Sequence, residues 1–124
     1  MTMPASASPR IAVLTTGGTI ASTYDGAIGT VHATLDADAL LAGLPVASLP
    51  PIEGRSVLAR NSYALSLDEA LTIVRAISDA RSRSDIAGVV VAHGTDTLEE
   101  TAFLADLLLE PGKQFTLDAA CEHL

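Results

Sequence analysis

Short apolar runs alternate along the chain with segments whose apolar residues recur at helical spacing. Residues 11–14 and 88–91 are continuous apolar runs with little polar alternation, which is typical of strands covered on both faces. Between these runs, apolar residues recur every three or four positions from Leu67 to Ala80. Ser66 and Glu69 have the Ser-x-x-Glu spacing of a capping box, so the pattern predicts a helix that begins there.

Three further segments have weaker patterns. Residues 35–44 predict a short helix capped by Thr34, and residues 52–59 predict an extended segment that follows two prolines. Residues 17–32 contain four glycines among small polar residues, which predicts a long loop. Long loops in compact domains are usually functional or mobile, so this loop is a candidate for part of a functional site.

The last predicted helix follows the strand at 88–91. Thr97 and Glu100 repeat the capping-box spacing, and the stretch 110–112 (Glu-Pro-Gly) ends the helix. Strands that alternate with amphipathic helices predict an α/β fold: a doubly wound, mainly parallel sheet with flanking helices. No internal repeat or domain boundary interrupts the chain, and the sheet should be only part of a larger three-layer arrangement.

Composition narrows the class of protein. The 124 residues are 48% hydrophobic with a mean hydropathy of +0.38, which predicts one core-rich domain. A net charge of −8 and only 3% aromatic residues disfavour nucleic acids and anionic membranes as partners. Cys121 is the only cysteine, residues 1–9 lack the pattern of a secretory signal, and no apolar run reaches membrane-spanning length. We therefore expect a soluble, cytoplasmic protein.

Two threonine-rich segments follow predicted strands and are the candidates for chemistry. Gly17 and Gly18 permit a sharp turn that would present the Thr19 hydroxyl at a strand end, although a plain tight turn explains the glycines equally well. After the second strand, the Asp96 carboxylate beside Thr95 could bind an ammonium group or cap the next helix. Neither the Gly-x-Gly-x-x-Gly nor the Walker pattern is present, which disfavours a nucleotide-binding module.

Taken together, the two segments closely resemble the L-asparaginase family, amidohydrolases that use a threonine nucleophile. Residues 16–21 (Thr-Gly-Gly-Thr-Ile-Ala) match one family signature, and residues 93–101 (His-Gly-Thr-Asp-Thr-Leu-Glu-Glu-Thr) match the other. The resemblance covers residues 10–112 as an incomplete N-terminal asparaginase-like domain, preceded by a flexible lead at 1–9 and followed by an atypical tail at 113–124.

The resemblance implies hydrolysis of L-asparagine, and possibly L-glutamine, with no metal or organic cofactor. Thr19 would be the nucleophile, Thr95 would position or activate the reacting hydroxyl or water, and Asp96 would bind the α-ammonium group. Ser62 would hold the α-carboxylate of the substrate. Members of the family usually assemble as homotetramers, so a homo-oligomer is expected for the full-length protein.

Several residues depart from the family pattern. Tyr63-Ala64 stand where many relatives have Gln-Asp, and Tyr24 lies two residues before the usual site of the flap tyrosine, so it is either a shifted flap residue or an exposed loop tyrosine. The tail at 113–124 resembles nothing in the family, and Lys113 is not expected to replace the catalytic lysine that relatives supply later. We therefore expect a truncated or frameshifted chain with little activity. The alternative is a non-catalytic, amino-acid-binding remnant of an asparaginase domain.

Overall fold

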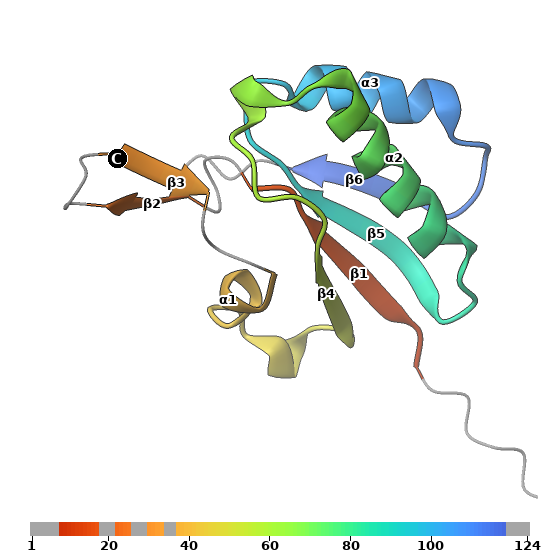
Figure 1. Ribbon diagram of the computed structural model, residues 1–124. Helices are drawn as coiled ribbons and strands as arrows, with labels where there is room; N and C mark the ends of the chain where they lie inside the picture. Colours follow the sequence, from red (N-terminus) through yellow and green to blue (C-terminus); the bar gives the residue numbers. More distant parts are fainter. Residues whose placement is uncertain (1–7, 18–21, 26–29, 34–36, 119–124) are drawn as a thin grey trace, which may run out of the picture.

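A four-stranded parallel sheet forms the centre of the computed structural model, which describes residues 8–17, 22–25, 30–33 and 37–118 (Figure 1). Its strands are β1 (Arg10–Thr15), β4 (Ile52–Ser56), β5 (Ile86–Ala92) and β6 (Phe115–Asp118). They lie in the order β4-β1-β5-β6, and every pair is parallel. The predicted α/β class with a doubly wound parallel sheet is confirmed.

A β-hairpin occupies the segment for which a long loop was predicted, so that prediction was wrong in part. Strands β2 (Ser22–Asp25) and β3 (Thr30–Ala33) pair in antiparallel register, with Tyr24 opposite Val31, and project away from the main sheet (Figure 1). Each strand has only four residues, and their β-branched and aromatic residues lie among glycines and polar residues. The glycines therefore dominated the sequence pattern and concealed the strands.

Two helices cover one face of the sheet. Helix α2 (Leu67–Ser82) packs on β5 and on helix α3 (Leu98–Leu108), and both helices lie on the same side in Figure 1. The aliphatic side chains of Leu14, Ile73 and Ile77 are fully buried in the core between α2 and the strands. The predicted capping box of α2 is present, because the Ser66 hydroxyl accepts from the Glu69 N–H and the Glu69 carboxylate accepts from the Ser66 N–H.

The short helix α1 (Ala37–Leu41) lies on the opposite face, over β4. It ends at Leu41, earlier than the predicted end at residue 44, and its expected cap Thr34 lies outside the described residues. Gly54 pairs with Val13, which faces away from the core formed by Ala12 and Leu14. A Cβ atom on Gly54 would lie 2.6 Å from Leu41 Cδ1, so this glycine is what allows α1 to approach the strand closely.

Much of the apolar surface of α3 faces outward. Thr101 and Ala105 are the buried residues of this helix, whereas Phe103 is 64% exposed and Leu107 and Leu108 are also exposed. Leu67, which we grouped with the apolar face of α2, is likewise exposed, because it is the first residue of that helix and lies beyond the sheet contact. The helical spacing was correct, but spacing alone did not reveal which apolar residues the sheet covers. None of the described helices is both long and apolar enough to span a membrane.

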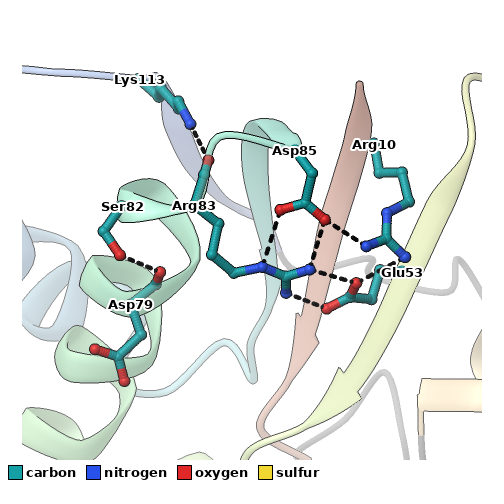
Figure 2. A network of polar contacts seen from close by, with 7 residues as sticks. All are labelled: Arg10, Glu53, Asp79, Ser82, Arg83, Asp85 and Lys113. Atoms are coloured by element: carbon teal, nitrogen blue, oxygen red, sulfur yellow. Dashed lines mark hydrogen bonds and ion pairs between the residues drawn. The ribbon is translucent and has the colours of Figure 1, made fainter. Parts of the chain in front are cut away.

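The amino-terminal ends of the strands are joined by a network of charged side chains (Figure 2). Arg83 contacts Glu53 at 2.5 and 3.0 Å and Asp85 at 2.8 and 3.1 Å, and Arg10 binds the same two carboxylates. Hydrogen bonds from Arg83 and Arg10 lower the pKa of Asp85 to about 2, and the bond from Arg83 lowers that of Glu53. Lys113 donates to the Arg83 carbonyl oxygen at this same end. Just beyond it begins β6, a strand that was not expected in the tail at 113–124.

Candidate functional site

The candidate site lies where the strand order of the sheet reverses. After β1 the chain crosses to β4 on one side, and after β5 it crosses to β6 on the other, so the connections leaving β1 and β5 diverge. Such a divergence at the carboxyl ends of parallel strands is where open α/β sheets bind ligands. Both threonine-rich segments begin at this point of the fold.

The end of β1 is fixed to the end of β5. The Thr16 N–H and the Thr16 hydroxyl both donate to the Ala92 carbonyl oxygen, each at 3.1 Å, and Thr16 is fully buried. Gly17 follows with a φ of 87°, the only positive φ angle among the described residues. That backbone conformation favours glycine, so the glycine turn begins as the sequence predicted.

Two predicted site residues cannot be assigned a geometry. Thr19 lies outside the described residues. The backbone of Tyr24 belongs to strand β2 rather than to a loop. Its side chain is not among the groups that the structure describes. The roles of Thr19 and Tyr24 therefore stay predictions.

The two ends of the second signature contact each other. His93 is fully buried at the end of β5, where its Nδ1 lies 2.6 Å from the Gly94 carbonyl oxygen and its Nε2 lies 3.0 Å from the Thr101 hydroxyl. A carbonyl oxygen only accepts, so Nδ1 donates to Gly94, while Nε2 forms the hydrogen bond with the Thr101 hydroxyl. His93 thus ties the strand end to the first turn of α3, a structural role.

Ser62, Asp96 and Thr97 form the polar centre of the site, although 34 or more residues separate Ser62 from the other two. Ser62 begins the 3-10 turn η3 (Ser62–Ala64) and is only 2% exposed. Its hydroxyl lies 3.0 Å from Asp96 Oδ2 as donor and accepts from the Asp96 N–H at 3.1 Å. The Thr97 hydroxyl donates to the Ser62 carbonyl oxygen at 2.9 Å. Two predicted site residues, Ser62 and Asp96, are therefore in direct contact.

The predicted capping box at α3 is not formed. Thr97 occupies the N-cap position, but its side chain makes no capping hydrogen bond. The Thr97 hydroxyl donates to the Ser62 carbonyl oxygen instead, so Thr97 connects the start of α3 to the turn that contains Ser62. Local spacing suggested the capping box, whereas a partner 35 residues away in the sequence left no local signal.

The cluster opens to solvent on one side. Asp96 and Thr95 are exposed, while the hydroxyl that supports Asp96 is buried beneath it. An exposed carboxylate held by a buried hydroxyl and a backbone N–H is a preorganised acceptor for an ammonium group.

Other candidate groups lie elsewhere. Lys113, the one lysine of the sequence, donates to Arg83 at the opposite end of the sheet from Asp96. In the part of the chain that the structure describes, no three His, Cys, Asp or Glu side chains gather in a way that could hold a metal ion. Cys121, the only cysteine of the sequence, falls outside the described residues.

Comparison with known proteins relates the sequence and the fold of this chain to one family. The family model "Asparaginase, N-terminal" matches residues 10–117, which reach into β6. The glutaminase-asparaginase of Acinetobacter glutaminasificans is 37% identical over 114 residues, covering 87% of this chain and 34% of that protein. The thermostable L-asparaginase from Thermococcus kodakarensis superposes with a TM-score of 0.76 at 34% identity, covering 89% of this chain and 33% of that structure.

A second solved structure gives the same result. The probable cytoplasmic L-asparaginase from Campylobacter jejuni superposes with a TM-score of 0.75 at 31% identity, covering 90% of this chain and 32% of that structure. The chain thus spans about a third of the length of the relatives it matches. With matching signatures, topology and family model, this chain belongs to the asparaginase family, of which it corresponds to the N-terminal part.

Proposed function

We propose that this chain supplies the substrate-anchoring half of a site that hydrolyses L-asparagine to L-aspartate and ammonia. The observation that supports this most directly is the contact between the Ser62 hydroxyl and the Asp96 carboxylate at the point where the strand order reverses. A carboxylate and a hydroxyl side by side are complementary to the ammonium and carboxylate groups of an α-amino acid. L-Glutamine, which has the same α-groups, is a possible second substrate.

In this proposal the Thr19 hydroxyl gives up its proton and attacks the side-chain amide carbon of asparagine. The C–N bond then breaks, ammonia leaves as the acyl-enzyme forms, and water hydrolyses that ester to L-aspartate and free Thr19. Thr95, exposed in the turn beside Asp96, positions or activates the reacting hydroxyl or water. Tyr24 is kept as a possible flap residue because its strand belongs to the hairpin that follows Thr19. We further propose that the full-length protein is a cytoplasmic homo-oligomer. It acts on a small molecule and uses no metal or organic cofactor.

The position of Lys113 favours a second candidate function, amino-acid binding without turnover. The anchoring groups Ser62 and Asp96 are assembled, but the one lysine of the sequence lies at the opposite end of the sheet, bound to Arg83. Transition-state stabilisation needs several groups positioned together. We therefore expect the 124-residue chain by itself to bind better than it catalyses.

Titration calorimetry with L-aspartate, together with an ammonia-release assay on L-asparagine, tests both candidates. We expect Asp96→Asn to weaken aspartate binding by about tenfold or more, because a charge-assisted hydrogen bond is lost. Asp106→Asn removes the same charge from an exposed position on α3 and should leave binding unchanged. Ammonia release that vanishes in Thr19→Ala would make the chain itself an enzyme, and binding without ammonia release would favour the second candidate. An absence of aspartate binding would refute the proposed anchoring site.

A further inference from the structure

Building on the proposed function, we propose that Arg60 and Glu69 form a positioning pair that holds Ser62 in place for the substrate. Neither residue belongs to the two family signatures, and neither directly contacts Ser62 or Asp96, the proposed substrate-binding residues. Instead, Arg60 connects three elements around Ser62: the end of β1, the turn that contains Ser62, and the first turn of α2.

The contacts of Arg60 bracket the serine turn. Its backbone N–H donates to the Thr16 carbonyl oxygen at 3.0 Å, at the end of β1. Its guanidinium group reaches over the turn and donates to the Ala64 carbonyl oxygen at 3.1 Å, two residues beyond Ser62. Arg60 thereby contacts the turn at Ala64, whereas Asp96 and Thr97 contact it at Ser62.

Glu69 contacts the same guanidinium group through the Nε atom of Arg60. Its Oε1 lies 3.0 Å from Arg60 Nε, while its Oε2 accepts from the Ser66 N–H at 2.8 Å. The Ser66 N–H and the Arg60 charge lower the pKa of Glu69, so the carboxylate stays ionised at neutral pH. The capping box of α2 therefore anchors Arg60 to a helix that is itself packed in the core.

Because the Arg60–Glu69 pair is partly exposed, we expect it to position the serine turn while contributing little to the free energy of unfolding. The Arg60 side chain is 50% exposed and that of Glu69 is 27% exposed, and ion pairs of this kind contribute little to global stability. The Ser62 hydroxyl, in contrast, must keep its place within a fraction of an ångström to serve a ligand and Asp96 together. Loss of the pair should loosen the turn while the fold remains.

Amide hydrogen exchange measured by NMR on the 124-residue chain tests the pair without a ligand. The Asp96 N–H donates to the Ser62 hydroxyl and the Leu65 N–H to the Ser62 carbonyl oxygen, so both report on the turn. We expect Arg60→Gln to speed exchange at these two amides by about twofold to fivefold, since a weak surface pair is lost. The Val89 amide, which donates to Gln114 within the sheet, should not change.

Matched variants isolate the pair. Glu69→Gln keeps an acceptor for the capping box but removes the charge that holds Arg60, so it should reproduce the effect. Arg60→Lys keeps the charge with a single donor group and should be intermediate. Arg75→Gln removes the same charge from an exposed position on α2 and should change neither amide.

Two results would overturn the proposal: wild-type exchange at Asp96 and Leu65 in Arg60→Gln, or an equal acceleration at Val89, which would mean global loosening. In parallel, the dissociation constant for L-aspartate should rise about twofold to fivefold in Arg60→Gln and stay unchanged in Arg75→Gln. If the wild-type chain binds no aspartate, the proposed function has failed, and the exchange data still decide whether Arg60 positions Ser62.

Discussion

Replacing Thr97 by valine removes one hydroxyl and leaves a side chain of nearly the same shape. In the structure this hydroxyl donates to the Ser62 carbonyl oxygen at 2.9 Å, and that oxygen also accepts from the Leu65 N–H at 3.2 Å. The carbonyl group therefore keeps one partner in the variant, so the loss is that of one net hydrogen bond, about 1 kcal/mol. For a domain of this size we expect the melting temperature to fall by about 3–6 °C. Urea unfolding followed by circular dichroism, with unchanged slopes, measures the free energy of unfolding.

Two further substitutions at Thr97 separate this explanation from helix capping. Thr97→Ser keeps the hydroxyl and should recover most of the stability under either explanation. Thr97→Asp discriminates: if Thr97 capped α3, aspartate would match or improve it, because aspartate is a better N-cap and favours a helix N-terminus. With Ser62 as the partner, the carboxylate has no proton to donate and lies beside Asp96, so stability should fall at least as far as in Thr97→Val. A Thr97→Asp variant more stable than the wild type would refute the reasoning.

Two other predictions concern acid sensitivity and association. Folding lowers the pKa of Asp85 from 3.8 to about 2 through hydrogen bonds from Arg83 and then Arg10, so its stabilisation is present above pH 3.8 and lost as the pH falls through about 2. Urea midpoints measured across that range should therefore decline less steeply in Asp85→Asn than in the wild type, and parallel curves would contradict the assignment. Phe103 and Leu107 leave an apolar surface on α3, so the wild-type chain should associate in sedimentation velocity and Phe103→Lys should shift it toward monomer. A compact wild-type monomer would show that this surface does not drive association.

The accuracy of the sequence-based predictions depended on how local each signal was. The strands at 11–14 and 88–91, and the α2 capping box of Ser66 and Glu69, were predicted correctly, because their signals lie within a few residues. Thr97 and Glu100 have the same spacing but form no capping box, because the Thr97 hydroxyl donates to the Ser62 carbonyl oxygen. The hairpin strands were missed because four-residue strands among glycines give no clear alternation.

By itself the sequence determined the α/β class, the order of the main strands and helices along the chain, and the membership in the asparaginase family. These follow from hydrophobic periodicity and two short signatures, which are properties of neighbouring residues. Only the tertiary structure decided which side chains meet where the strand order reverses. The Ser62–Asp96 contact and the Arg60–Glu69 pair follow from how the crossover connections bring β4, α2 and β5 together. The Ser62–Asp96 contact joins residues 34 positions apart, and the Arg60–Glu69 pair joins a loop to a helix. Both exist only once burial of the aliphatic core has set the register of the sheet.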